Sequence, residues 1–306
     1  MSLPCSDIRS SETLKKPPWI RVKLPTGEAC KQVERVLQKH RLHTVCDEAW
    51  CPNKGCCWGA GTATFMILGN RCTRACRFCR VSRGPQGEEI RSDEGAALAA
   101  AAQELGLRYL VLTSVDRDEL PDRGAGHFAA CLTAIKAGNP GIAVELLIPD
   151  YTAGEIAPIA AAGPEVIAHN VETVRSLQWI RDPRASFDTS LATLRHAKIY
   201  RKNRKDRTKG GMVTKTSLLL GLGEKKAEVL TAMDELREAA VDILVMGQYL
   251  RPSPAQIPVV EYISPEGFEG YAEEARNRGF AAVVSAPLAR TSYQAHAAWK
   301  LAQDAD

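Results

Sequence analysis

Apolar, β-branched runs alternate along the chain with segments whose apolar residues have helical spacing. The apolar runs predict strands at residues 62–68, 109–114, 142–148, 166–169, 214–220, 243–246 and 281–285. The helical spacing predicts helices at residues 28–40, 93–105, 126–137, 156–162, 187–198, 225–239 and 265–278. About six βα units follow from this alternation. They predict an α/β fold, a partial (β/α)6 TIM-type barrel that stays open on one side.

Segments at both ends lie outside this repeat. Residues 1–60 are predicted to form an N-terminal arm and extension, residues 61–285 the barrel, and residues 286–306 a C-terminal segment. Prolines at positions 4, 17, 18 and 25 predict that the arm, residues 1–27, is irregular.

Composition narrows the class of protein. The chain has 306 residues, of which 45% are hydrophobic and 25% are charged, and this is typical of a globular domain. The formal net charge of +4 is too small to indicate a nucleic-acid partner, although it suits an acidic protein. We find neither a signal-peptide core nor an apolar run of membrane-spanning length, so we expect ten thiols in a reducing cytoplasm.

Seven of the ten cysteines lie between Cys46 and Cys79. The downstream group is C-x3-C-x2-C, formed by Cys72, Cys76 and Cys79. Three thiolates on a short loop can bind three irons of a [4Fe-4S] cluster and leave the fourth iron open to a small molecule. A zinc knuckle is the alternative, but it usually needs a fourth protein ligand from a second pair.

The upstream group allows two assignments. Cys46, Cys51 and Cys57 give C-x4-C-x5-C, whereas Cys56 in place of Cys57 gives C-x4-C-x4-C. A structural zinc or a disulfide is the alternative use of these thiols, and the expected reducing compartment disfavours a disulfide. The residues alone do not decide between Cys56 and Cys57.

Polar residues follow several predicted strands, at the barrel end where functional groups usually gather. Thr113 ends the second strand, and Asn170 and Glu172 follow the fourth. We take these three as candidate contacts to a cofactor, with turn formation or helix capping as the alternative. A basic run at residues 200–211 could steer an acidic partner or simply be a solvated loop.

Taken together, the cysteine groups and several further motifs resemble the lipoyl synthase family of radical S-adenosylmethionine (SAM) enzymes. The supporting motifs, in chain order, are KPPWIRVKLP at 16–25, TSVDRDELPDRGA at 113–125, HNVETV at 169–174, KTSLLLGLGE at 215–224, GQYLRPS at 247–253 and ARTSY at 289–293. They cover nearly the whole chain.

The resemblance implies two [4Fe-4S] clusters and SAM as cofactors. The cluster on Cys72, Cys76 and Cys79 would bind SAM at its open iron and start radical chemistry, with Thr113, Asn170 and Glu172 contacting SAM. An auxiliary cluster on the upstream extension would surrender sulfide. Two sulfurs would thereby enter at C6 and C8 of an octanoyl chain carried on a lysine.

The family pattern also places a serine from a C-terminal RSSY motif on the auxiliary cluster. This chain reads Arg290, Thr291, Ser292, Tyr293, so Ser292 is the implied ligand. An alkoxide is a weaker ligand for iron than a thiolate is. It is therefore chemically reasonable that the serine dissociates from the iron when the cluster loses sulfide. Four residues depart from the family pattern: Cys56, Gln256, Ala286 and Thr291.

The partners implied are octanoylated lipoyl carrier domains, namely the E2 subunits of 2-oxoacid dehydrogenases or the glycine cleavage H protein. A flavodoxin- or ferredoxin-type reductant and an iron-sulfur carrier are also implied, with neither a nucleic acid nor a membrane. One alternative is another sulfur-inserting radical SAM enzyme, such as a tRNA methylthiotransferase, but those usually append a basic RNA-binding module. A non-catalytic iron-sulfur electron carrier is the other, and it would cleave no SAM.

Overall fold

The structure is a computed structural model, and it describes residues 14–60, 62–203 and 211–305. Within these residues the main sheet has eight strands in the order β1-β2-β5-β6-β7-β8-β9-β10. Its strands are β1 (His43–Thr44), β2 (Thr64–Ile67), β5 (Tyr109–Ser114), β6 (Ala143–Leu147), β7 (Val166–Ala168), β8 (Val213–Leu220), β9 (Ile243–Gln248) and β10 (Ala282–Ala286). All neighbours from β2 to β10 pair in parallel, and β1 pairs with β2 antiparallel.

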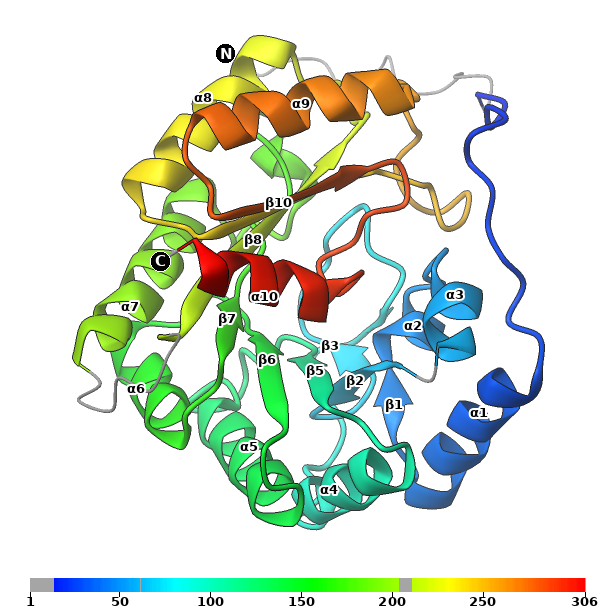
Figure 1. Cartoon of the computed structure of the whole chain (residues 1–306), viewed down its shortest axis with the longest axis vertical. Coiled ribbons are helices and arrows are strands. Elements are labelled where there is room, and N and C mark those ends of the chain that lie inside the picture. Colours follow the sequence, from blue (N-terminus) through cyan, green and yellow to red (C-terminus); the bar gives the residue numbers. More distant parts are fainter. Residues whose placement is uncertain (1–13, 61, 204–210, 306) are drawn as a thin grey trace.

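The helices cover the outside of this curved sheet (Figure 1). They are α1 (Glu28–His40), α2 (Val45–Glu48), α3 (Lys54–Gly59), α4 (Glu94–Glu104), α5 (Ala125–Gly138), α6 (Ala153–Ala162), α7 (Phe187–Asn203), α8 (Lys226–Glu238), α9 (Pro265–Asn277), α10 (Ala295–Asp304) and the 3-10 helix η1 (Arg175–Ile180). A small second sheet pairs β3 (Arg71–Cys72) with β4 (Ser82–Arg83). None of the described helices combines the length and apolar character needed to cross a membrane.

The predicted partial barrel is confirmed by the parallel order of the strands from β2 to β10, and the strands from β2 to β9 are mostly buried, as a parallel sheet requires. Phe65 of β2 pairs with Leu112 of β5, and both side chains are fully buried. The predicted helix at 28–40 is observed with the same limits, and it buries Val33, Val36 and Leu37. Residues 14–27 form neither helix nor strand, as the prolines predict.

Helix α10 was missing from the prediction. It packs at the barrel end where the strands begin, where His296 stacks on Tyr109 with ring centroids 5.0 Å apart. Next to this contact, the Tyr109 hydroxyl donates to Glu145 at 2.7 Å, and Glu145 forms a fully buried ion pair with Lys215 at 2.9 Å. These contacts fill the barrel end where the strands begin, so open space is left at the end where the strands finish.

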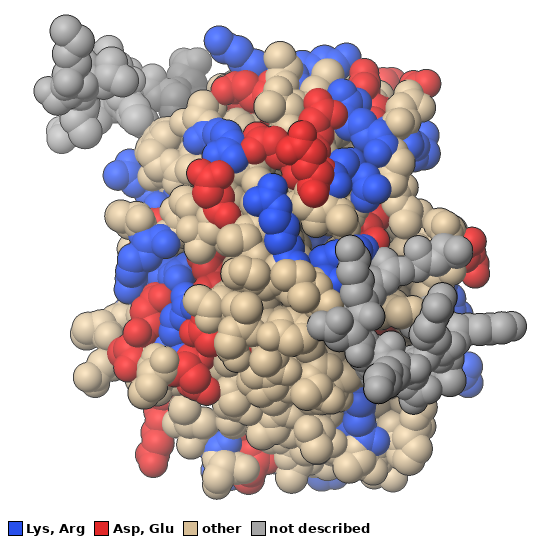
Figure 2. Space-filling model, turned by 90° about the vertical axis from the view of Figure 1, so that its left-hand side faces the viewer, with Lys and Arg blue, Asp and Glu red and all other residues tan. Residues whose placement is uncertain are grey.

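Helices α1, α2 and α3 lie beside β1 at one edge of the barrel, and the arm of residues 14–27 runs along the same side (Figure 1). Figure 2 shows a different face, on which Lys and Arg side chains stand among Asp and Glu side chains. The side chains of the basic run, at positions 201–210, lie outside the described residues.

Candidate functional site

The upstream cysteines sit on two short helices and the turn between them. Cys46 belongs to α2, which Thr44 caps by accepting a hydrogen bond from the Asp47 amide at 3.3 Å. Cys51 lies in the following turn, with its amide bonded to the Cys46 carbonyl at 3.1 Å. Cys57 belongs to α3 and is half-buried, whereas its neighbour Cys56 is exposed. The fold therefore directs Cys57 inward.

Electrostatics support the same grouping. Burial raises the pKa of Cys46 to about 11, and a nearby Cys51 thiolate would raise it further. Burial raises the pKa of Cys57 to about 12, with contributions from Cys46, Cys51 and Cys56. Thiols that raise one another's pKa lie close together and resist ionisation, and a bound metal would reverse this by stabilising the thiolates.

The downstream cysteines lie on a loop that other segments hold in place. Cys72 ends β3, and its sulfur accepts a hydrogen bond from the Arg74 amide at 3.4 Å. The Cys76 sulfur accepts from the Asp182 amide at 3.3 Å. Arg83 donates to the Cys76 carbonyl at 2.8 Å and the Cys79 carbonyl at 3.1 Å. These hydrogen bonds hold the loop in a defined shape.

Burial also makes these thiols hard to ionise. Burial raises the pKa of Cys72 to about 12, and the Asp116 carboxylate adds to the shift. Burial likewise raises the pKa of Cys76 to about 12, and Cys79 adds to it. The Cys72 thiol donates to Asp116 at 3.7 Å.

Neither triplet has the spacing of a single-metal site. Zn–S bonds of about 2.3 Å in a tetrahedral site place sulfurs roughly 3.8 Å apart. Among the described residues, the one group of three potential ligand atoms within 4.8 Å of one another is Glu94, His127 and Cys131. Glu94 and His127 already bond to each other there at 2.7 Å. The wider spacing of both cysteine triplets fits a multi-iron cluster better than a zinc ion.

Two cavities meet at the end of the barrel where the strands finish. The larger, about 670 Å³, is lined by Cys46, Cys51 and Ser292, and the smaller, about 250 Å³, by Cys72 and Cys76. Six residues line both cavities: Val45, Phe78, Cys79, Leu147, Asn170 and Glu172. The two cavities therefore adjoin, with Cys46 and Cys51 on one, Cys72 and Cys76 on the other, and Cys79 on both, whereas Cys57 lines neither.

The three candidate cofactor contacts all reach these cavities. Thr113 lines the smaller cavity, and its hydroxyl donates to the Leu147 carbonyl at 3.1 Å. Asn170 donates to the Glu172 carboxylate at 3.1 Å, and both residues line both cavities. Glu172 has a φ of 65°, a strained conformation for a residue other than glycine and one often found at functional sites.

A buried polar atom beside these contacts lacks a partner. The Ser114 hydroxyl lines the smaller cavity and forms no hydrogen bond with the described residues. A buried hydroxyl is normally satisfied, so the cavity favours a polar occupant. Burial raises the pKa of Glu172, with Arg181 and Asn170 opposing the shift.

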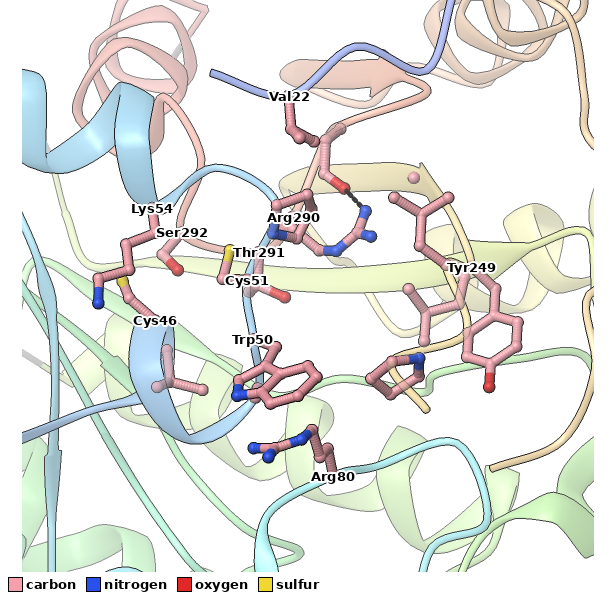
Figure 3. Close-up of a pocket in the computed structure, with 18 of the residues that line it drawn as sticks. Val22, Cys46, Trp50, Cys51, Lys54, Arg80, Tyr249, Arg290, Thr291 and Ser292 are labelled. Carbon is pink, nitrogen blue, oxygen red and sulfur yellow. Dashed lines mark hydrogen bonds between the residues drawn. The ribbon is translucent and has the colours of Figure 1, made fainter. Parts of the chain in front are cut away.

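The C-terminal segment places Ser292 beside the upstream cysteines. Figure 3 shows Cys46, Cys51, Thr291 and Ser292 together on one side of the larger cavity. Thr291 is buried, and its hydroxyl lies 3.1 Å from the Asn170 oxygen and 3.0 Å from the Ser217 hydroxyl. Thr291 is thus engaged by the barrel, while the half-buried Ser292 lines the cavity.

Comparisons with known proteins agree with this geometry. The profile of the radical SAM superfamily matches residues 66–245, and that of the N-terminal domain of lipoyl synthase matches residues 6–51. A lipoyl synthase of Methanocella arvoryzae is 49% identical, covering 92% of this chain and 94% of its own. A lipoyl synthase of Thermus thermophilus is 50% identical, covering 92% and 85%. The chain belongs to the lipoyl synthase family.

Solved structures confirm the fold of this lipoyl synthase family member. The crystal structure of a methylornithine synthase superposes with a TM-score of 0.55 at 13% sequence identity, covering 83% of this chain and 70% of that one. At this identity the likeness concerns the fold alone.

Three of the four departures from the family pattern have clear contacts. Gln256 donates to the Cys79 carbonyl at 3.3 Å and accepts from the Ser253 hydroxyl at 2.7 Å, so it holds the cysteine loop. Ala286 ends β10, and its carbonyl accepts from the Ala289 amide at 3.0 Å. Thr291 bonds to the barrel as described above. Nothing in the structure explains the exposed Cys56.

Sequence reasoning missed a buried charge network beside the smaller cavity. Asp150 forms ion pairs with Arg74, with His169 at 3.0 Å and with Arg181 at 3.7 Å. Burial alone would raise the pKa of Asp150, but His169 and the two arginines together hold it far below its usual range. Asp150 follows a predicted strand, as the candidate residues do. Its position in the sequence could therefore have identified it as a candidate.

Arg290 was also missed as a candidate. Figure 3 shows its side chain reaching between the cysteines and Tyr249. Burial lowers the pKa of the Arg290 guanidinium, with Cys51 and Glu172 opposing the shift. Within the described part of the chain Arg290 forms no ion pair, and its guanidinium donates to the Ala289 carbonyl at 2.6 Å. A half-buried cation without an anionic partner among the described residues favours an anionic group in the cavity.

Proposed function

We propose that this chain converts a protein-bound octanoyl chain to a lipoyl group. Two sulfurs are inserted, at C6 and C8, and one SAM is consumed for each C–H bond replaced by a C–S bond. The sulfur comes from an auxiliary [4Fe-4S] cluster. The observation that supports this most directly is that the cavities beside the two cysteine groups adjoin and share Phe78, Cys79, Asn170 and Glu172 as lining residues.

Cys72, Cys76 and Cys79 fit the cluster that binds SAM. Their loop is held by Arg83 and Asp182, so little reorganisation accompanies cluster binding. When bound, this cluster and SAM supply radical hydrogen abstraction, and the auxiliary cluster supplies sulfide. The protein's part is to orient these groups and to exclude water.

Thr113, Asn170 and Glu172 suit contacts to SAM. Asn170 and Glu172 stand where the two cavities meet, and a carboxylate there suits the positive groups of SAM. The unpartnered Ser114 hydroxyl offers a further hydrogen bond in the same cavity. Asp150 and its partners keep Arg74 and Arg181 fixed beside this site.

The auxiliary cluster fits Cys46, Cys51, Cys57 and Ser292. Arg290 supplies a half-buried positive charge next to Cys51, which would stabilise an anionic cluster with three thiolate ligands. Ser292 is the replaceable ligand, because alkoxide matches iron less well than thiolate does.

The larger cavity suits the octanoyl-lysyl arm. Apolar side chains line much of this cavity, among them Val22, Trp50, Tyr249 and Leu250. A long apolar chain bound there loses contact with water, which favours its binding. The reacting carbons would then lie between the two cysteine groups.

We further propose three units of function: residues 1–60 bind the auxiliary cluster, residues 61–285 form the SAM-binding barrel, and residues 286–306 supply the serine ligand. The nine described cysteines are free thiols, which suits a reducing cytoplasm. Lipoyl carrier domains are the substrate. A flavodoxin- or ferredoxin-type protein supplies electrons, and an iron-sulfur carrier rebuilds the consumed cluster.

The test is anaerobic reconstitution with iron and sulfide, followed by SAM, dithionite and an octanoyl-lysyl peptide. We expect the peptide to show the mass change for two sulfurs replacing two hydrogens. Formation of 5'-deoxyadenosine without a thiolated peptide would keep the radical chemistry but reject the substrate.

A further inference from the structure

The arm of residues 14–27 forms one border of the larger cavity. Ile20, Val22 and Leu24 line the cavity along this border. The arm also presents apolar side chains to solvent, because Trp19 is 40% exposed, Val22 52% and Leu24 69%. Exposed apolar residues gathered at a cavity mouth indicate a contact surface.

The arm carries charge of one sign. Lys15, Lys16, Arg21 and Lys23 are exposed, and residues 14–27 contain no carboxylate. None of these four cations forms an ion pair with the residues that the structure describes. The face in Figure 2 differs, because acidic and basic side chains are interspersed there. The arm therefore has a positive field that nothing in the described chain neutralises.

The arm is seated directly on the auxiliary cysteine region. A Cβ atom added at Gly55 of α3 would lie 2.1 Å from the Lys23 carbonyl oxygen, so the arm backbone touches α3 where the helix has no side chain. Arg80 stacks on Trp50 at 3.6 Å beside the same cavity, and Trp50 is 61% exposed. A positive and aromatic surface thus continues from the arm to the cysteine loop.

We propose that this surface, residues 14–27 with Trp50 and Arg80, docks an acidic carrier domain and directs its acylated lysine into the larger cavity. The inference rests on the proposed function and names the surface that selects the whole carrier. The four cations attract the acidic domain over a distance, while Trp19 and Trp50 supply apolar contact. A short peptide needs the cavity alone.

Lys15 and Arg21 allow a clean test, because both are exposed and neither lines the cavity. The variant K15E/R21E is compared with the control R108E/K300E, whose two exposed cations lie at the opposite end of the barrel. Each reconstituted full-length protein is given an octanoylated lipoyl domain of net negative charge and, separately, a short uncharged octanoyl-lysyl peptide.

K15E/R21E should raise KM for the domain about tenfold, leave kcat unchanged and leave both constants for the peptide unchanged. Its Kd for the octanoylated domain, measured by calorimetry without SAM, should rise to a similar extent. Added salt should weaken domain binding by the wild type more than by K15E/R21E. R108E/K300E should behave as the wild type does.

An unchanged KM and Kd for the domain in K15E/R21E would overturn the docking surface and leave the function intact. If the wild type thiolates neither substrate, the proposed function itself fails. In that case, a Kd for the domain that still rises in K15E/R21E would support the docking surface independently of the function. Sedimentation showing that K15E/R21E dissociates a wild-type dimer would assign the surface to self-association and overturn the proposal.

Discussion

The Thr291 hydroxyl donates to the Asn170 side-chain oxygen at 3.1 Å, across 121 positions of sequence. It shares a second hydrogen bond with the Ser217 hydroxyl at 3.0 Å. These contacts tie the residue before Ser292 to the loop after β7 and to the middle of β8. A threonine at this position thus keeps the hydroxyl that a serine would supply.

The hydrogen bonds of the Thr291 hydroxyl should hold Ser292 in position. Thr291→Val removes the hydroxyl at nearly constant volume, so it should cost roughly 1–3 kcal/mol of stability by leaving buried polar atoms unpaired. Because Ser292 loses its anchor, the auxiliary iron should also fall after reconstitution. Thr291→Ser keeps the hydroxyl and should retain both. Iron analysis and thermal unfolding give the answer, and full iron content in Thr291→Val would contradict the positioning role.

Gly247 determines how closely the same segment approaches the barrel. A Cβ atom there would lie 2.0 Å from the Ala289 carbonyl, so Gly247→Ala must displace the segment that carries Arg290 and Ser292. We expect a loss of roughly 1–3 kcal/mol and a weakened auxiliary cluster, with SAM cleavage largely preserved. Gly270→Ala is the matched control, because its Cβ meets nothing within 4 Å in α9. Equal behaviour of the two variants would refute the crowding argument.

The two adjacent cysteines of α3 should differ in their effects. Cys57 is directed toward Cys46 and Cys51, whereas Cys56 is exposed. Cys57→Ser should therefore lose much of the auxiliary iron, and Cys56→Ser should keep it. Mössbauer spectra of both reconstituted variants make the comparison, and the reverse order would select C-x4-C-x4-C instead.

Asp150 should stabilise the fold at neutral pH. Asp150→Asn leaves Arg74 and Arg181 buried without this carboxylate, which should cost about 3–5 kcal/mol. The pKa of Asp150 is depressed below its ordinary 3.8, so the stabilisation is complete above that pH and is lost as pH falls through the depressed pKa. Urea unfolding at neutral pH and in acid should show the wild-type advantage shrinking in acid. An advantage that grows in acid would contradict this assignment.

Features that depend on neighbouring residues could be predicted from the sequence. The parallel strands are apolar runs, and the cysteine triplets are local motifs, so both were visible without a structure. Helix α10 was missed because its N-cap, Gln294, has a positive φ and offers no side-chain cap, although Ala295, Ala298 and Ala302 have helical spacing.

Features formed between distant segments could not be predicted. Arg74 and Asp150 are 76 positions apart, and only the fold shows that they form a buried pair. The choice of Cys57 over Cys56 likewise depends on how α3 is oriented against α2. The positive charges of the arm could be interpreted as a docking surface only from the structure, which shows that the arm contacts Gly55 and lines the larger cavity.

The central claim is that the chain holds two clusters, one beside each of two adjoining cavities. Mössbauer spectroscopy with metal analysis of anaerobically reconstituted protein tests this claim most directly. The wild type should hold two [4Fe-4S] clusters per chain. Replacing Cys46, Cys51 and Cys57 together by alanine should leave one cluster, with SAM still cleaved and no sulfur transferred to the octanoyl-lysyl peptide. Zinc in place of iron, or a single cluster in the wild type, would contradict the account.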